Sequence, residues 1–288
     1  MSRIVFLNGS FLPIEQAHVS IMDRGFLFAD GVYEGYGVLD QRVIEIEGHL
    51  DRLERSLAEI RIANPYPRAR WAALMRELVD RNGLREGFLY AQVTRGTAER
   101  DFHFPVDTVP TVAMFTQPKA IAAAPIAETG IAVISVPDLR WKRRDIKSLS
   151  LLAQVLAKQA AREAEAGEAW LVEDGFVTEG GSSSAFIITR GGGIVVRPLS
   201  PAILPGITRR SIIRLAGEAG LAVEERRFTL DEAYDAAEAF LTSASNFVVP
   251  VVAIDGRPIG DGRPGPLTRR LRGFYLEMAR AEAASPDP

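Results

Sequence analysis

A segment near the middle of the chain constrains the fold most, because it divides the sequence into two parts of different character. Residues 117 to 125, Gln-Pro-Lys-Ala-Ile-Ala-Ala-Ala-Pro, show neither the alternation of a strand nor the apolar stripe of an amphipathic helix. The chain has 288 residues, 47% of them hydrophobic, and single hydrophobic cores seldom grow beyond about 250 residues. We therefore predict two domains with a linker between them.

The residue types that are absent or sparse restrict the chemistry. The chain has no cysteine, and its three histidines lie far apart at positions 18, 49 and 103. Disulfides, thiolate nucleophiles and cysteine-ligated metals are excluded, and no metal site is predicted. Chemistry must therefore come from lysine, glutamate, tyrosine, arginine or a cofactor.

The charge and hydropathy of the chain bear on its partners and location. The net charge of -3 creates no field that would gather nucleic acid, although Arg140, Lys142, Arg143 and Arg144 form a local basic cluster. No run of about eighteen apolar residues occurs, and the chain turns polar too early for a signal peptide. We expect a cytoplasmic protein that acts on anionic small molecules, with no nucleic-acid or membrane partner.

Hydrophobic periodicity predicts strands and helices on both sides of the linker. Apolar spacing indicates helices around residues 50–60, 71–83, 151–156 and 208–216 and from about 266, and Asp174-Gly175 is a strong signal for a tight hairpin. The predicted strands cover residues 88–93, 111–115, 131–136, 169–173, 176–179, 239–242 and 247–254.

One lysine lies where a reactive amine could be placed. Lys147 has the apolar neighbours Ile146, Leu149 and Leu151 and precedes a predicted helix, so it lies at a strand-to-helix junction. A lysine that is partly desolvated beside cations loses proton affinity, as an amine must before it forms a Schiff base. Taken alone, a lysine in this context is more commonly an ordinary surface residue.

Two downstream features complete the parts needed to hold pyridoxal phosphate (PLP). Glu179 ends a strand before two glycines and three serines, and a carboxylate facing the pyridine nitrogen of PLP keeps that nitrogen protonated. Gly206-Ile207-Thr208 opens a helix, whose first N–H groups form an anion site. Separately, these features are compatible with a solvated turn and with simple N-capping by Thr208. Arg52 could close on a phosphate dianion.

The combined pattern resembles the class IV (fold type IV) PLP-dependent aminotransferases, and among them most closely the D-amino acid (D-alanine) aminotransferases. Beyond the segments around Lys147, Glu179 and Thr208, the resemblance extends over motifs at Asn8-Gly9, Asp23–Phe26, Asp30–Glu34, His49–Leu53 and Thr94–Thr97. It implies an α+β fold with PLP at the domain interface. The implied domains are a smaller α+β domain over 1–118, a linker over 119–130 and a larger domain with a β-barrel-like core over 131–288.

The resemblance also implies residue roles. Lys147 would bond the cofactor and act as the catalytic base, and Glu179 would contact the pyridine nitrogen. The other implied cofactor ligands are Arg52, Ile207, Thr208, Ser243 and Ala244 around the phosphate and Leu204 by the ring, and the implied substrate ligands are Tyr33, Arg100, His103 and Ser183.

The sequence departs from the D-alanine aminotransferase pattern at the residues that would bind the substrate carboxylate. The best-known enzymes of that type carry Arg-x-His after the Arg-Gly-Thr turn and extend these side chains into the neighbouring subunit's site. Here Arg100 aligns, but Phe102 occupies the histidine position and His103 is shifted by one residue. A one-residue shift in an extended segment turns a side chain to the opposite face, whereas an arginine can bind a carboxylate without help.

The resemblance predicts a homodimeric transaminase that exchanges an amino group between a D-amino acid and a 2-oxo acid such as 2-oxoglutarate or pyruvate. Alternatives within the class are a branched-chain L-amino acid or (R)-amine aminotransferase and 4-amino-4-deoxychorismate lyase. A non-catalytic PLP-binding scaffold is the alternative from another class.

Overall fold

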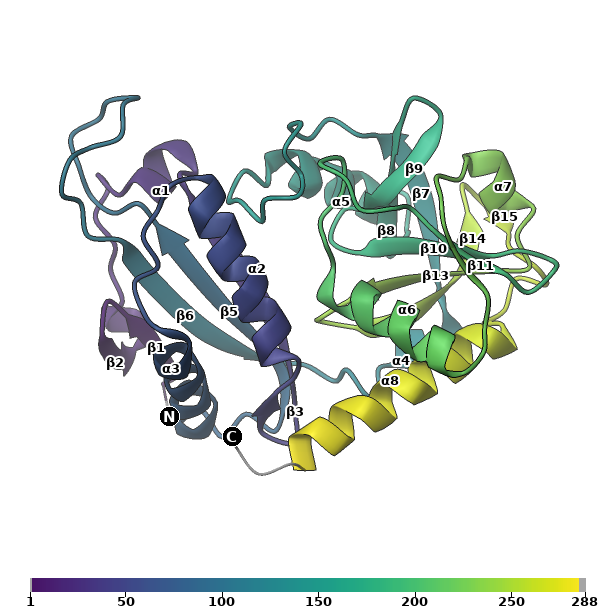
Figure 1. Cartoon of the computed structure of the whole chain (residues 1–288), viewed down its shortest axis with the longest axis horizontal. Coiled ribbons are helices and arrows are strands. Elements are labelled where there is room, and N and C mark those ends of the chain that lie inside the picture. Colours follow the sequence, from purple (N-terminus) through teal and green to yellow (C-terminus); the bar gives the residue numbers. More distant parts are fainter. Residues whose placement is uncertain (1, 285–288) are drawn as a thin grey trace. The chain divides into compact units, whose positions relative to one another are not determined.

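The computed structural model describes residues 2–284 and contains two compact units. The first comprises the described residues of Met1–Ala120 and Ala279–Pro288 together with Ile146–Ser150, and the second comprises Ile121–Asp145 and Leu151–Met278. Each unit is built on its own sheet (Figure 1). The short segment Ile146–Ser150 carries Lys147 and belongs to the first unit, although the second unit precedes and follows it in sequence.

The first unit has a six-stranded sheet in the order β2-β1-β6-β5-β3-β4, in which neighbouring strands are antiparallel. Its elements are β1 (Ile4–Leu7), β2 (Ser10–Pro13), η1 (Ile14–Gln16), α1 (Arg24–Phe28), β3 (Gly31–Leu39), β4 (Arg42–Val43), α2 (Ile46–Glu59), α3 (Arg68–Arg81), β5 (Glu86–Thr94) and β6 (Thr111–Pro118). The long central pairs β3–β5 and β5–β6 join nine and eight residue positions.

Helix α2 forms for the reason that its sequence predicts. Its apolar side chains Leu50, Leu53 and Leu57 recur at helical spacing and are each only 1% exposed. They join the core of the first unit, and α2 packs on β3 (Figure 1). The next helix, α3, stops at Asn82, whose side-chain amide donates to the carbonyl oxygen of Leu78 at 3.1 Å.

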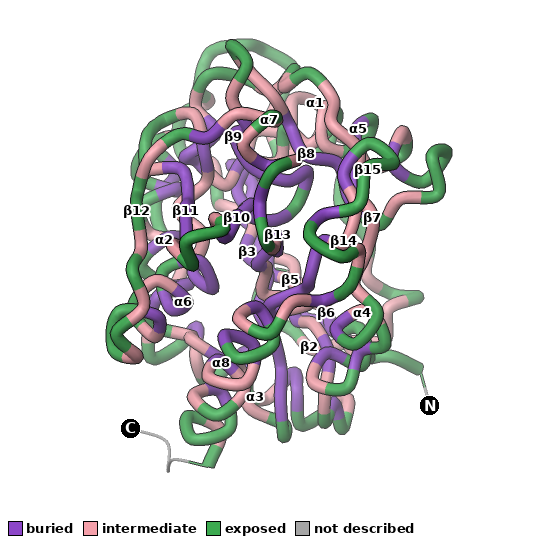
Figure 2. The backbone as a smooth tube through the Cα atoms, turned by 90° about the vertical axis from the view of Figure 1, so that its right-hand side faces the viewer, coloured by how far each residue is buried: buried purple, intermediate pink, exposed green. Residues whose placement is uncertain are grey.

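The second unit has a nine-stranded sheet in the order β12-β11-β10-β13-β14-β7-β8-β9, with β15 paired to β14. Its elements are α4 (Pro125–Thr129), β7 (Ile131–Pro137), α5 (Leu152–Glu163), β8 (Glu168–Glu173), β9 (Phe176–Gly180), β10 (Ser184–Ile188), β11 (Ile194–Val196), α6 (Ile207–Glu218), β12 (Val223–Glu225), α7 (Leu230–Tyr234), β13 (Glu238–Ser243), β14 (Phe247–Ile254), β15 (Arg257–Pro258) and α8 (Pro266–Ala284). Strand β7 runs parallel to both β14 and β8. Buried residues follow the strands of both sheets (Figure 2).

The hairpin predicted between β8 and β9 is confirmed, since Asp174 and Gly175 both have positive φ angles, 53° and 80°. A two-residue turn of this kind needs left-handed backbone at both positions, which Asp-Gly supplies at low cost. Residues 119–130, predicted as a linker, contain the one short helix α4. The predicted barrel-like character of the larger domain stays a prediction, and residues 285–288 of its range lie outside the described residues.

Helix α5 forms beyond Lys147 as predicted, but it does not bury its large apolar side chains. Leu152, Val155 and Leu156 are 72%, 58% and 58% exposed. The buried residues of α5 are Ala157 and Ala161, which pack with Ala169 and Leu171 of β8. The helix therefore lies close to the sheet through its small residues and leaves an apolar face uncovered.

Candidate active site

Lys147 is held against strand β3 of the first unit by backbone pairing. The Tyr33 N–H donates to the carbonyl oxygen of Lys147 at 3.0 Å, and the Leu149 N–H donates to the carbonyl oxygen of Gly31 at 3.0 Å. The Lys147 N–H in turn donates to the Ser56 hydroxyl of α2 at 3.3 Å. This segment therefore behaves as a short extra strand, which fixes the backbone from which the Lys147 side chain projects.

The Lys147 amine lies over an aromatic face. Its Nζ is 4.3 Å from the centroid of the Tyr33 ring, and that ring stacks on Tyr90 at 5.5 Å. The structure thus brings together two of the predicted site residues, Lys147 and Tyr33.

Strand β3 has glycine at position 31, where the backbone of β5 and a side chain of the Lys147 segment approach it closely. A Cβ atom at Gly31 would lie 2.5 Å from the carbonyl oxygen of Val93 and 2.8 Å from Cδ1 of Leu149. Real Cβ atoms do not approach backbone atoms this closely, so a side chain here would strain the pairing of β3 with β5 beside the Lys147 segment.

Arg52 is the predicted phosphate ligand of the first unit, and in the structure it forms a buried ion pair. Its Nε and Nη2 donate to the two carboxylate oxygens of Glu34 at 2.7 and 2.8 Å, and His49 Nδ1 lies 2.7 Å from the same carboxylate. Burial would raise the pKa of Glu34, but Arg52 outweighs it and lowers the pKa to about 2. Burial also lowers the pKa of His49. The role of Arg52 at a phosphate stays a prediction.

The second unit carries the predicted anion site at the start of α6. The first N–H groups of any helix have no acceptor within the helix. Here the N-cap is Gly206, which has no side chain to accept from them. A Cβ at Gly206 would lie 2.8 Å from the Ser184 hydroxyl, so the chain approaches closely only because this residue is glycine. Ile207 and Thr208 follow as buried residues, 6% and 3% exposed.

Two hydroxyl groups predicted to bind phosphate are buried without a hydrogen-bond partner among the described residues. These are Oγ1 of Thr208 on α6 and Oγ of Ser243 at the end of β13. A buried hydroxyl without a partner costs about 1–3 kcal/mol, and such groups in a native structure call for an explanation. Two spare donors in the unit that also holds a helix N-terminus fit the phosphate of PLP. Ala244 follows Ser243 in a turn.

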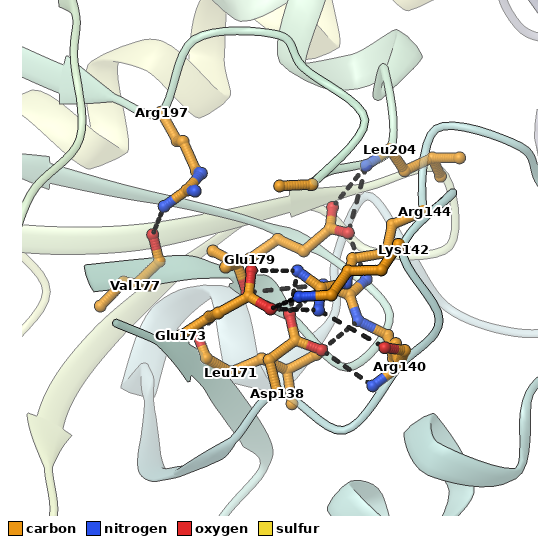
Figure 3. A network of polar contacts seen from close by, with 12 residues as sticks. Asp138, Arg140, Lys142, Arg144, Leu171, Glu173, Val177, Glu179, Arg197 and Leu204 are labelled. Carbon is orange, nitrogen blue, oxygen red and sulfur yellow. Dashed lines mark hydrogen bonds and ion pairs between the residues drawn. The ribbon is translucent and has the colours of Figure 1, made fainter. Parts of the chain in front are cut away.

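Glu179 lies at the end of β9, as predicted, and is 5% exposed. The Leu204 N–H donates to both of its carboxylate oxygens, at 3.1 and 3.2 Å, and Arg140 Nη1 donates to Oε1 (Figure 3). Burial raises the pKa of Glu179 although Arg140 opposes it. A fixed, buried carboxylate of this kind is the group that the pyridine nitrogen of PLP requires.

Ser183 is also placed by the structure, but its hydroxyl already has an acceptor. It donates to Glu168 at 3.1 Å, as the Ser182 hydroxyl does, and Lys158 pairs with the same carboxylate at 3.1 Å. Glu168 therefore orders the serine loop that follows Glu179. The predicted contact of Ser183 with substrate stays a prediction.

The loop after β5 presents Arg100 on the surface of the first unit. The Arg100 guanidinium carbon lies 5.1 Å from the Phe28 ring centroid and 5.5 Å from that of Phe102. His103 is 92% exposed at its side chain, and its Nδ1 lies 3.1 Å from the Asp101 carboxylate. The shifted histidine is thus engaged with its own loop, whereas Phe102 accompanies Arg100. The roles of Arg100 and His103 stay predictions.

The residues that sequence reasoning missed are the partners of the site residues. Glu34 lies within one of the aligned motifs, but no sequence pattern links it to Arg52, and Arg140 stands out in the sequence only as part of a basic cluster. The cluster is locally neutralised, since Arg140, Lys142, Arg143 and Arg144 pair with Asp138, Asp145, Glu173 and Glu179. Asp138 and Asp145 flank the four bases of this cluster in the sequence, and these flanking acids are the signal that could have suggested ion pairs.

The family model described as amino-transferase class IV matches residues 31–254, which is well over half of the chain. This chain belongs to the class IV aminotransferases. The predictions of an aminotransferase, of the fold type IV α+β architecture and of PLP as the cofactor on which this family depends are thereby confirmed.

Individual class IV aminotransferases are similar to this chain over nearly its whole length. It is 42% identical over 282 residues to a D-alanine aminotransferase of Bacillus licheniformis, covering 97% of this chain and 98% of that protein. It is 40% identical over 277 residues to a D-alanine aminotransferase of Staphylococcus aureus (strain N315), covering 95% and 98%. A crystal structure of a branched-chain aminotransferase from the archaeon Thermoproteus uzoniensis with norvaline matches with a TM-score of 0.85 at 27% identity, covering 98% and 96%.

Proposed function

We propose that this class IV aminotransferase is a D-amino acid transaminase, which moves an amino group from a D-alanine-like donor to a 2-oxo acid such as 2-oxoglutarate. The observation that carries the proposal is the near-complete alignment with D-alanine aminotransferases at 40–42% identity. The branched-chain enzyme of known structure is similar in fold but only 27% identical. The higher identity to the D-alanine aminotransferases therefore favours the D-amino acid branch.

The residues of both units have distinct tasks in this proposal. Lys147 would bond PLP and, once released, its Nζ would take the proton from the donor Cα. Tyr33 lies beside that amine and would limit the positions open to the substrate. The hydroxyls of Thr208 and Ser243, the first turn of α6 and Arg52 would bind the phosphate. When bound, PLP would supply the electron sink for the negative charge that develops at Cα as the proton leaves.

Glu179 would keep the pyridine nitrogen protonated, because its carboxylate is held in place by the Leu204 N–H and by Arg140. Ile207, Ala244 and Leu204 would supply backbone or apolar contacts to the cofactor. Ser183, Arg100 and His103 remain the proposed substrate ligands, with Arg100 as the carboxylate ligand since a guanidinium can bind a carboxylate bidentately.

The assay that tests this proposal measures pyruvate release from D-alanine with 2-oxoglutarate as the acceptor, using PLP-loaded protein. L-Leucine, an (R)-amine and 4-amino-4-deoxychorismate serve as competing donors. We expect turnover with D-alanine and loss of turnover in Lys147→Ala, which also removes the visible absorbance of the lysine-bound cofactor. Turnover restricted to L-leucine, or pyruvate release from aminodeoxychorismate without an acceptor, would contradict the proposal.

We also propose that the enzyme is a homodimer. The support from the structure is the exposed apolar face of α5, where Leu152, Val155 and Leu156 follow helical spacing and are each more than half exposed. Light scattering coupled to size-exclusion chromatography gives the mass of the particle. A particle of one chain's mass, 31.5 kDa, would contradict a dimer. The predicted cytoplasmic location stays a prediction, and within residues 2–284 no helix is long and apolar enough to span a membrane.

A further inference from the structure

Glu179 lies at one end of a chain of ion pairs in the second unit, which is buried except at its other end, Glu173 (Figure 3). Arg140 contacts Glu179 through Nη1 and binds Asp138 through Nε and Nη2 at 2.9 and 2.7 Å. Arg144 lies 3.3 Å from Asp138 and binds Glu173 at 2.8 and 2.9 Å. Charges of opposite sign therefore alternate along the chain from Glu173 to Glu179.

Asp138 fixes the Arg140 side chain in one position. Its carboxylate is fully buried and accepts from the Arg140 backbone N–H at 3.2 Å in addition to the guanidinium, and it accepts from the Thr178 hydroxyl at 2.7 Å. Burial raises the pKa of Asp138, but Arg140 outweighs it and holds the pKa below its ordinary value. The guanidinium thus directs its Nη1 at Glu179.

This contact matters because Glu179 is a buried carboxyl group. Removal from water favours the protonated form of such a group, and a nearby guanidinium opposes that effect. If Glu179 took up a proton, it would have no negative charge to stabilise a protonated pyridine nitrogen. Arg140, which Asp138 holds in place, therefore favours the ionised form of Glu179.

We propose that Arg140 is a positioning residue that holds Glu179 as a carboxylate aimed for the pyridine nitrogen of PLP, so that the proton stays on the ring nitrogen. The inference rests on the proposed function, because it takes the role of Glu179 from it. Arg140 acts through Glu179 and not on the substrate. The competing explanation is that the ion-pair chain only stabilises the fold.

The location of the ring proton can be measured in holoenzyme loaded with PLP that carries nitrogen-15 in its ring. The nitrogen chemical shift separates protonated from unprotonated pyridine. In Arg140→Gln we expect the resonance to move towards unprotonated pyridine, because each pKa unit that Glu179 gains moves the proton about tenfold towards the carboxylate. Arg140→Lys keeps a charge but cannot span Asp138 and Glu179 together, so a smaller move in the same direction is expected.

Arg144→Gln is the matched control. It removes a buried arginine from the same ion-pair chain without touching Glu179, and it should lower the thermal midpoint while leaving the ring nitrogen resonance unchanged. The deuterium isotope effect at the donor Cα should grow only in the Arg140 variants, since a weaker electron sink slows proton removal.

An unmoved resonance in the Arg140 variants would overturn the inference, as would an equal move in Arg144→Gln. If Arg140→Gln does not fold, Arg140→Lys decides alone, and an unmoved resonance there has the same meaning. Failure of the proposed function gives a different result, since the wild-type protein would then show no D-alanine turnover. If the wild type is active and the ring nitrogen resonance is unchanged in the Arg140 variants, only the proposed role of Arg140 is refuted.

Discussion

Replacing Glu34 by glutamine tests whether the buried ion pair with Arg52 stabilises the first unit through its charge. The Glu34 side chain is fully buried. Its carboxylate accepts hydrogen bonds from two nitrogens of Arg52 and also contacts His49. Lowering its pKa from 4.5 to about 2 corresponds to about 3 kcal/mol at about 1.36 kcal/mol per pKa unit. Removing one partner of a buried pair typically costs about 3–5 kcal/mol. Both routes predict that Glu34→Gln lowers the free energy of unfolding at neutral pH by roughly 3 kcal/mol.

The pH dependence distinguishes charge from packing. The folded-state pKa of Glu34 lies below its unfolded value, so its contribution is complete above pH 4.5 and is lost as the pH falls through about 2. The difference between wild type and Glu34→Gln should therefore shrink below pH 4.5, with less than about half of it left near pH 3. Other acidic groups titrate alike in both proteins and cancel in this difference.

The assay is urea denaturation followed by far-ultraviolet circular dichroism at a series of pH values. Glu47→Gln is the matched control, because Glu47 lies on the same helix as Arg52 but is 68% exposed at its side chain and pairs with Arg68 at the surface. It should change the unfolding midpoint little. A difference between wild type and Glu34→Gln that stays constant from neutral pH to pH 3 would refute the electrostatic reasoning and assign the loss to packing.

Three further outcomes are expected. Thr208→Val should raise the thermal midpoint of the PLP-free protein slightly, since it removes an unpartnered buried hydroxyl, yet weaken PLP binding in a fluorescence titration. Thr268→Val also removes an unpartnered buried hydroxyl and should raise the thermal midpoint without changing PLP binding. If the Thr208 and Thr268 variants bind PLP equally well, Thr208 does not contact the phosphate. Gly31→Ala should strain the pairing of β3 with β5 and lower the thermal midpoint, and an unchanged midpoint counts against the close approach. Gly273→Ala, inside α8 with open space around it, should stabilise the protein by about 0.5–1 kcal/mol in urea denaturation, and a destabilised variant would show that the site is not open.

Local sequence patterns determined much of the secondary structure. Leu50, Leu53 and Leu57 specified α2 because apolar side chains at helical spacing can share one core, and Asp174-Gly175 specified the hairpin because both residues tolerate left-handed backbone. The motifs around Lys147, Glu179 and Thr208, together with those of the N-terminal half, indicated the class IV aminotransferases, and the family match confirmed it.

Only the tertiary structure decided which side chains meet. No local rule connects Glu34 on β3 with Arg52 on α2, or Arg140 with Glu179, because these pairs form when separate elements are packed together. The apolar residues of α5 likewise predicted a helix but not which of its faces is buried, since Ala157 and Ala161 pack on β8 while Leu152 stays exposed. Periodicity is a property of one segment, whereas burial and pKa depend on neighbours far away in sequence. The sequence therefore indicated the family and its candidate reactive groups, and the fold set the charge and orientation of those groups.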